Sequence, residues 1–290
     1  MTCAVRYVVV LAALLLAKVA AAEDRAVPCP GFTVMGEGPD LVLVPGLGSS
    51  PAVWDGVRDS LAKDYRLHLV HIAGFAGRSP SGEPEGLLER SRAEIIRHLD
   101  CTGVTSAAYA GHSLGGFLGL TLAARHPDRI TRVVVIDSLP FFPLIFDPAA
   151  TPERAAPQAD AMRASIMAQD DMGFAAGQRM GVASLVRDPA YHDQVVEWSL
   201  ASDRASFAGA MHALMTTDIR PELAGIRQPV TIMVAANRFA PRALVEPLYR
   251  KAYQELAGAE FRVIEDSYHF IMFDQPEAFR DTLTAALPAP

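Results

Sequence analysis

The feature that most constrains the fold of this chain is a five-residue turn between an apolar run and a helical stretch. The turn is Gly111-His112-Ser113-Leu114-Gly115, which has the pattern G-x-S-x-G. Apolar residues 107–110 precede it, and the glycine-rich apolar stretch 116–124 that follows favours a packed helix. A serine in a sharp strand-to-helix turn exposes its hydroxyl in front of a helix N-terminus. The sequence therefore predicts that Ser113 is a nucleophile, and a glycine-rich turn that merely contains a serine is the alternative.

The length and composition of the chain fit one large α/β domain with an insertion, or two small domains. The chain has 290 residues, of which 50% are hydrophobic and 20% are charged, so it can bury a sizeable core. Its formal net charge of -7 argues against a nucleic-acid partner, and no basic run indicates binding to an anionic membrane surface. The cysteines and histidines do not have zinc spacing, so we expect neither a metal nor a cofactor.

The N-terminus, residues 1–22, has the pattern of a secretory signal peptide. Arg6 gives a weakly positive start, residues 8–17 form a short apolar run, and Ala20-Ala21-Ala22 offers small residues for cleavage. The apolar run is too short for a comfortable membrane span. We therefore expect cleavage near Ala22, export to the periplasm or the medium, and no stable membrane insertion afterwards. An uncleaved anchor is the alternative, because Lys18 interrupts the end of the apolar run.

Cysteine usage is compatible with export. Cys3 would be removed with the signal peptide, which leaves Cys29 and Cys101. Two remaining cysteines in an oxidising compartment can form a disulfide. Two separate thiols are an equally good interpretation.

Short apolar runs alternate with helical stretches along most of the chain. Strands that are apolar throughout and alternate with helices indicate a doubly wound, mostly parallel sheet with helices on both faces. The expected strands are 41–44, 67–72, 107–110, 133–136, 230–234 and 261–264. The expected helices are 54–61, 87–99, the stretch after Ser113 to about 126, 244–257 and a terminal helix from about 276.

Residues 139–225 break this rhythm because they contain no strong strand run. This segment is rich in alanine and methionine and has helical periodicity, so we expect it to form a helical lid between core segments 23–138 and 226–290. Methionine thioethers adapt to irregular shapes and can line an apolar pocket, although ordinary helix packing explains any single methionine equally well. The predicted pocket residues are Phe141, Phe142, Met211 and Met215.

A serine hydroxyl becomes a good nucleophile only when a base lies within hydrogen-bond reach and an acid orients that base. His269 is the best candidate base, because it follows the last expected strand and precedes the last expected helix. Its loop should open on the same edge of the sheet as the turn that carries Ser113. His112 is expected to point elsewhere, and His98 is expected to lie at the surface or in the lid.

Several motifs in this order resemble the α/β-hydrolase fold superfamily over nearly the whole mature chain. The motifs that carry the resemblance are Val44–Ser50 with Trp54 soon after, Gly74–Ser79, the turn around Ser113, His126–Arg129, and His269 with Pro276-Glu277 downstream. The resemblance implies that backbone N–H groups of Leu47 and Leu114 bind an oxyanion.

The acid departs from the usual pattern of the superfamily. In most members it follows the strand expected here at 230–234, but residues 235–241 contain no carboxylate. Some members carry the acid one strand earlier, where Asp137 directly follows 133–136 and keeps the chain order Ser, Asp, His. Asp137 could instead simply cap its loop. Asp266 and Asp218 are weaker candidates, and Asn237 could orient an imidazole without stabilising its charge.

The sequence thus predicts an exported serine hydrolase that acts on a small hydrophobic substrate. It would cleave a carboxylic ester, a lactone or a thioester through an acyl-enzyme on Ser113. A peptidase or an acyltransferase that uses the same three residues is an alternative within this class. A small-molecule binding protein that kept the pocket and lost turnover is an alternative outside it. The sequence does not predict an oligomeric state.

Overall fold

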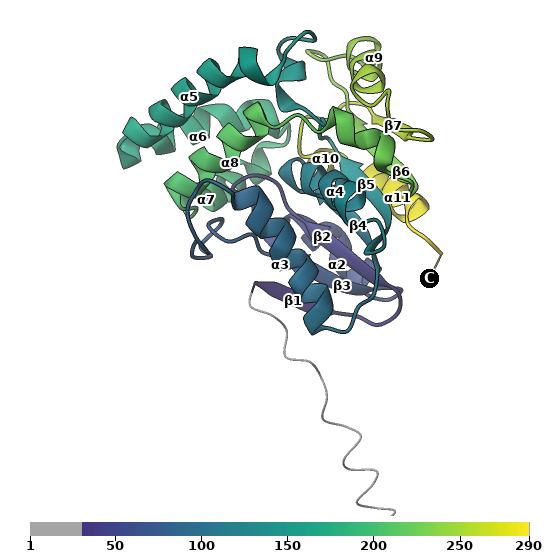
Figure 1. The fold of residues 1–290 in the computed structure, drawn as a ribbon. Helices are drawn as coiled ribbons and strands as arrows, with labels where there is room; N and C mark the ends of the chain where they lie inside the picture. The colour runs from purple at the N-terminus through teal and green to yellow at the C-terminus, as the bar shows by residue number, and fades with distance from the viewer. Residues whose placement is uncertain (1–30, 290) are drawn as a thin grey trace, which may run out of the picture.

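The computed structural model describes residues 31–289 (Figure 1). The predicted signal peptide, its cleavage site near Ala22 and Cys29 lie outside the described residues. Cys101, the last residue of α3 (Leu87–Cys101), is disulfide-bonded, but its pairing with Cys29 stays a prediction. Within residues 31–289, no helix combines the length and the apolarity needed to cross a bilayer.

The described strands form one sheet in the order β1-β3-β2-β4-β5-β6-β7. All neighbouring pairs are parallel except β1 and β3, which are antiparallel. The strands are β1 (Phe32–Met35), β2 (Asp40–Val44), β3 (Arg66–Val70), β4 (Ala107–His112), β5 (Ile130–Ile136), β6 (Val230–Ala235) and β7 (Glu260–Ile264). The prediction of a mostly parallel α/β sheet is confirmed, and the six strands expected from apolar runs are present. The edge strand β1 was not expected.

Helices cover both faces of the sheet, which explains why the inner strands are apolar at most of their positions. In β2, Val42 and Val44 belong to one core cluster, and Leu41 and Leu43 belong to the other. Successive side chains of a strand point to opposite faces, so an apolar residue is needed at each position when both faces are covered. The first cluster lies under α3, α4 (Leu114–Arg125) and α9 (Arg242–Ala252). The second lies under α2 (Asp55–Leu61) and α11 (Pro276–Ala286).

The segment between β5 and β6 is helical, and its main helices lie together at one end of the molecule (Figure 1). It contains η2 (Phe142–Ile145), α5 (Pro152–Ala168), α6 (Asp171–Leu185), η3 (Pro189–Tyr191), α7 (His192–Leu200), α8 (Arg204–Thr216) and η4 (Arg220–Gly225). The side chains of Thr151, Asp170 and Asp203 accept backbone N–H bonds at the starts of α5, α6 and α8. Such caps satisfy amides that the first helical turn leaves unpaired. The lid function of residues 139–225 stays a prediction.

The expectation that His98 lies at the surface or in the lid is wrong. Its side chain is fully buried between α3 and the edge of the sheet. The ring stacks on Phe32 of β1 at 3.9 Å between centroids, and Nε2 lies 2.8 Å from Nδ1 of His68. The amphipathic helix α3 turns this histidine inward because His68, from β3, offers it a hydrogen-bond partner in the core.

Candidate active site

The turn that carries Ser113 joins β4 to α4 and is held in an unusual backbone conformation. Ser113 has φ 53° and ψ -117°, a strained geometry for a residue with a side chain. A Cβ atom added to Gly115 would lie 2.3 Å from the carbonyl oxygen of Val44, and one added to Gly111 would lie equally close to Gly115. The hydroxyl of Tyr109 donates to the Gly115 carbonyl at 2.7 Å. Glycines at both positions therefore let the helix approach the sheet closely enough to form the turn.

His269 and Asp137 are brought together at the edge of the sheet where the parallel strands end. His269 lies between β7 and α10 (Ile271–Asp274), and its Nδ1 lies 2.7 Å from Oδ2 of Asp137. A carboxylate only accepts hydrogen bonds, so Nδ1 carries the proton and Nε2 is left as an acceptor. The side chains are 26% and 14% exposed, respectively, so the pair is partly shielded from water while the imidazole stays accessible.

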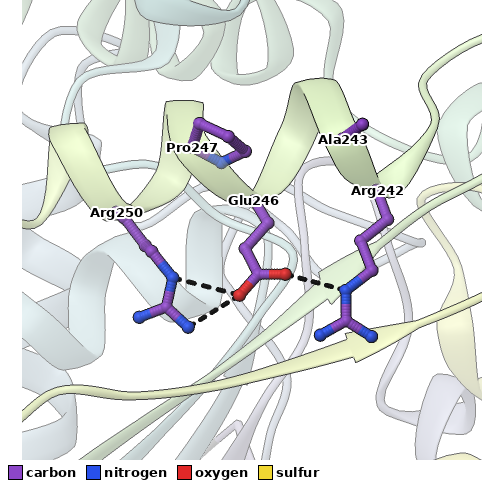
Figure 2. Close-up of a pocket in the computed structure, with 5 residues that line it drawn as sticks. All are labelled: Arg242, Ala243, Glu246, Pro247 and Arg250. Atoms are coloured by element: carbon purple, nitrogen blue, oxygen red, sulfur yellow. Dashed lines mark hydrogen bonds and ion pairs between the residues drawn. The ribbon is translucent and has the colours of Figure 1, made fainter.

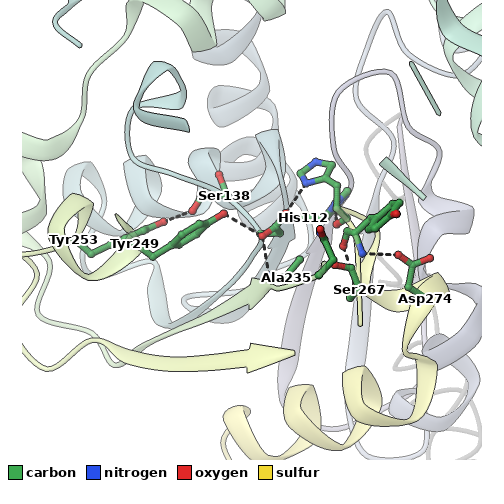
Figure 3. A network of polar contacts seen from close by, with 11 residues as sticks. His112, Ser138, Ala235, Tyr249, Tyr253, Ser267 and Asp274 are labelled. Carbon is green, nitrogen blue, oxygen red and sulfur yellow. Dashed lines mark hydrogen bonds and ion pairs between the residues drawn. The ribbon is translucent and has the colours of Figure 1, made fainter. Parts of the chain in front are cut away.

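The second oxygen of the Asp137 carboxylate is also fully engaged (Figure 3). Oδ1 accepts hydrogen bonds from the Ala235 backbone N–H and from the Tyr249 hydroxyl, both at 3.0 Å. The Asp137 backbone N–H donates to the carbonyl of Met233 at 2.9 Å, which extends the pairing of β5 with β6. Asp137, which follows β5, thus reaches past β6 to the loop after β7. The intervening strand β6 supplies a backbone donor to its carboxylate.

Within residues 31–289, neither of the other candidate acids makes a hydrogen bond or an ion pair with His269. Asp218 makes a bidentate ion pair with Arg220. The backbone carbonyl of Asp266 accepts from the side chains of Arg187 and Gln275. Among the described residues, the carboxylate in contact with His269 is that of Asp137.

Asn237 occupies the position after β6 where the superfamily usually carries its acid. Its side-chain oxygen accepts from the backbone N–H groups of Phe239 and Ala240, at 2.9 and 3.0 Å. Its amide nitrogen donates to the carbonyl of Ser267 at 3.2 Å. Asn237 therefore holds the backbone of the loop that leads to His269 and does not touch the imidazole.

His112, expected to point elsewhere, contacts the backbone of His269. Its Nε2 donates to the carbonyl oxygen of His269 at 3.0 Å, and the two rings lie 4.5 Å apart. Burial, together with the nearby His269, holds the pKa of His112 well below its usual 6.5, so the ring stays neutral and keeps a fixed donor. Sequence reasoning missed this contact, although the position of His112 next to Ser113 at the end of β4 was a signal.

The backbone amides proposed to bind an oxyanion are positioned near Ser113. A Cβ atom added to Gly46 would lie 3.1 Å from the Cβ of Ser113, so the loop that carries Leu47 passes directly beside the serine. Leu114 opens α4, where the first N–H groups have no partner within the helix. Within residues 31–289, neither the Leu47 N–H nor the Leu114 N–H donates a hydrogen bond to the protein.

Ser113 Oγ and His269 Nε2 are likewise without hydrogen-bond partners in the part of the chain that the structure describes. Catalytic hydrogen bonds of unliganded enzymes are commonly long and tighten when substrate binds. Neither atom is therefore engaged by another group of residues 31–289.

The predicted pocket residues differ in their exposure. Phe141 is fully buried in the first core cluster beneath the guanidinium of Arg220, and Met215 is also fully buried. Phe142 and Met211 are half-buried. Their role as a pocket lining stays a prediction.

A surface hollow lies along α9, and none of the predicted pocket residues lines it (Figure 2). Its lining includes Glu246, whose carboxylate is held by Arg242 at 2.8 Å and by Arg250 at 2.6 Å. The other lining residues are Ala243 and Pro247. The hollow offers no nucleophile, and its one carboxylate is already held by two arginines, so we do not assign the chemistry to it.

No group of three or more histidine, cysteine, aspartate or glutamate side chains within residues 31–289 is arranged to hold a metal ion.

Comparison with known proteins gives matches over most of the chain. A family model described as the alpha/beta hydrolase family matches residues 41–282. A pimeloyl-[acyl-carrier protein] methyl ester esterase of Aeromonas hydrophila is 29% identical over 248 residues, which cover 84% of this chain and 93% of that protein. The esterase of the same name from Klebsiella pneumoniae is 29% identical over 257 residues, which cover 88% of this chain and 96% of that protein.

Solved structures share the fold at lower sequence identity. An enol-lactonase from Burkholderia xenovorans superposes with a TM-score of 0.72 at 24% identity and covers 88% of this chain and 94% of its own. A thermophilic esterase from Thermogutta terrifontis superposes with a TM-score of 0.70 at 19% identity, over 88% of this chain and 91% of its own.

Proposed function

The chain belongs to the alpha/beta hydrolase family, and from this premise we propose that it is a serine hydrolase that cleaves carboxylic esters. The observation that carries the proposal is the 2.7 Å hydrogen bond between His269 and Asp137, at the sheet edge that also holds the strained turn of Ser113. The similarity to methyl ester esterases over most of both chains supports ester cleavage. We extend the proposal to lactones and thioesters, because they present the same acyl carbon to a serine.

The proposed reaction proceeds through an acyl-enzyme. Ser113 Oγ attacks the acyl carbon while Nε2 of His269 takes its proton, and Asp137 stabilises the imidazolium that forms. The N–H groups of Leu47 and Leu114 bind the oxyanion of the tetrahedral intermediate. His269 then returns the proton to the departing alcohol. Water, activated by the same imidazole, attacks the acyl-enzyme and restores Ser113.

We propose a small hydrophobic acyl group as the substrate of this reaction. The lid segment, residues 139–225, carries Phe142 and Met211 in half-buried positions. Adaptable apolar side chains of this kind suit a substrate that presents few polar groups.

We propose that the protein is exported, because residues 1–22 have the charge and hydropathy pattern of a signal peptide. Mass measurement of the protein recovered from the periplasm or the medium tests this, since cleavage near Ala22 gives a defined mass. The same measurement after alkylation, with and without reductant, tests the pairing of Cys29 with Cys101. A protein of full-length mass found only inside the cell would contradict export.

The catalytic proposal is tested by labelling with a serine-directed fluorophosphonate and by a panel of chromogenic acyl esters of rising chain length. We expect one label on Ser113, no label on the Ser113→Ala variant, and turnover that depends on acyl length. A folded protein that binds the esters but is neither labelled nor active would identify a binding protein instead.

A further inference from the structure

We propose that Tyr249, on α9, is a positioning residue of the active site, because its hydroxyl holds the Asp137 carboxylate in the orientation that His269 requires. This inference rests on the proposed function, since it assigns a role to a residue that acts through the Asp137–His269 pair. Tyr249 lies 112 residues after Asp137 in the chain and has no place in the sequence motifs.

The two carboxylate oxygens of Asp137 accept hydrogen bonds from different groups. Oδ2 accepts from Nδ1 of His269, and Oδ1 accepts from Tyr249 and from the Ala235 backbone N–H. These three hydrogen bonds come from three different elements and fix both the position and the rotation of the carboxylate. Figure 3 shows the Tyr249 side chain extended from α9 toward this oxygen.

The carboxylate needs a side-chain donor because water reaches it poorly. Asp137 is 14% exposed at its side chain, and a shielded charge without sufficient donors is costly. The turn after β5 begins at Asp137 itself, which has φ 45°, and the backbone of β6 contributes one donor through Ala235. Tyr249 supplies a second donor, and hydrogen bonds to an ionised acceptor are stronger than neutral ones.

Tyr249 is suited to act as a permanent donor. It is 5% exposed, and burial, reinforced by the negative charge of Asp137, raises its pKa well above the usual 10. Its hydroxyl therefore keeps its proton throughout the pH range in which an ester hydrolase works.

Tyr253 provides a matched control on the same helix. It lies one turn further along α9, is 1% exposed, and its ring stacks near that of Tyr249 at 6.4 Å between centroids. Its hydroxyl donates to the backbone carbonyl of Ser138 at 2.6 Å. Tyr249→Phe and Tyr253→Phe therefore each remove one buried hydroxyl and one hydrogen bond, but only the first hydrogen bond reaches the Asp137 carboxylate.

The experiment compares wild type, Tyr249→Phe and Tyr253→Phe by thermal unfolding and by the pH profile of chromogenic ester hydrolysis. We expect Tyr249→Phe to lose roughly tenfold to a hundredfold in kcat, with KM little changed. The loss should fall on kcat and not on KM, because the carboxylate acts on the imidazolium that forms only during the reaction. Tyr253→Phe should keep the wild-type profile and a kcat within about twofold, although both variants lose similar stability.

A double-mutant cycle with Asp137→Ala separates positioning from a general loss of packing. If Tyr249 acts through Asp137, adding Tyr249→Phe to the Asp137→Ala variant leaves the residual rate unchanged. Equal kinetic profiles for the two phenylalanine variants, or a further loss in the double variant, would overturn the inference. A Tyr249→Phe variant that unfolds where Tyr253→Phe does not would also count against it, because it would show a structural role.

The proposed function and this inference fail in distinguishable ways. A wild-type protein without ester turnover and without phosphonate labelling defeats the proposed function. A labelled, active wild type whose Tyr249→Phe variant behaves like Tyr253→Phe defeats the inference alone.

Discussion

In the proposed mechanism, the carboxylate of Asp137 stabilises a positive charge that exists only during the reaction. When His269 takes the proton of Ser113 in that mechanism, its ring becomes an imidazolium, with Nδ1 2.7 Å from Oδ2 in the structure. A neutral side chain at this position keeps the fold but loses both the charge and the correct imidazole tautomer. We therefore expect Asp137 to stabilise the transition state, so that its removal lowers kcat.

Asp137→Ala is expected to reduce kcat by about ten-thousand-fold, whereas Ser113→Ala and His269→Ala each cost about a million-fold. The measurement is steady-state hydrolysis of a chromogenic acyl ester, with circular dichroism to show that each variant is folded. Asp218→Ala is the control, because Asp218 is bound by Arg220. A folded Asp137→Ala variant with near-normal turnover would show that the acid assignment is wrong.

Single residues differ in how far the sequence could predict their place. The G-x-S-x-G turn and the order of strands suffice to place Ser113, His269 and Asp137 on one edge of a parallel sheet, and the structure brings the latter two into contact. Their catalytic roles stay predictions. Tyr249 could not be found in this way, because a donor on a helix surface has no local pattern and its partner lies 112 residues away.

At the scale of secondary-structure elements, glycine has opposite effects on stability in α4, where it is required, and in α6, where it weakens the helix. A Cβ atom on Gly115 would collide with the backbone of Val44 and Pro45, which no side-chain rotation can relieve. Gly181, in the middle of α6, has open space at the corresponding position and only weakens its helix.

We therefore expect Gly181→Ala to raise the free energy of unfolding by about 0.5–1 kcal/mol. Gly115→Ala should lower it by more than about 2 kcal/mol and reduce labelling of Ser113, because α4 must move away from the end of β2 and the loop that follows it. Urea denaturation measures both. A Gly115→Ala protein with unchanged stability and labelling would show that the turn does not depend on close approach of the helix.

The edge formed by β1, β3 and α3 contains a buried chain of polar groups. The Asp40 carboxylate accepts from Nε2 of His68 at 2.8 Å, so Nδ1 of His68 accepts from Nε2 of His98. Nδ1 of His98 is buried without a partner in the described structure. Burial, together with nearby His68 and Arg66, lowers the pKa of His98 to about 4.

This edge should lose stability in mild acid. Unfolded His98 takes up a proton near pH 6.5 and folded His98 only near pH 4, so the unfolded state binds more protons between these values. The free energy of unfolding therefore falls as the pH drops through this window, by up to about 3 kcal/mol from His98. Urea denaturation at about pH 7.5 and about pH 4.5 measures the difference, and His98→Gln should reduce it. The same pH dependence in both proteins would contradict the prediction.

Helices and strands could be predicted from the sequence where burial of apolar side chains alone determines them. The inner strands could be predicted from apolar runs, because a strand covered on both faces buries successive apolar side chains on opposite faces. Strand β1 was missed because only one neighbour pairs with it and none of its residues is fully buried, so its composition carries no such run. The inward place of His98 depends on the same edge and was missed for the same reason.

At the scale of the whole molecule, the lid segment is joined to the loop that carries His269. Oδ1 of Asp274 accepts from the backbone N–H groups of Arg187 and Asp188, at 2.9 and 3.2 Å. Its Oδ2 accepts from the Tyr268 N–H at 2.7 Å. The Phe270 N–H also donates to the carbonyl of Leu185, at 3.1 Å. The sequence predicted a helical insertion but not this connection, because its donors are main-chain N–H groups that any residue could supply.

Asp274 should therefore couple the position of the lid segment to that of His269. Asp274→Asn keeps the shape of the side chain, but its NH₂ group must face N–H donors on one of the two sides, so one set of hydrogen bonds is lost. We expect stability to fall by about 1–3 kcal/mol and kcat/KM to fall by about tenfold. Asp281→Asn is the matched control, because Asp281 is exposed on α11 and, within residues 31–289, bonds only to the adjacent Arg280. Thermal unfolding and ester hydrolysis measure both effects. If the two variants behaved alike, the lid segment and the His269 loop would be held together by their packing, and Asp274 would have no part in setting the active site.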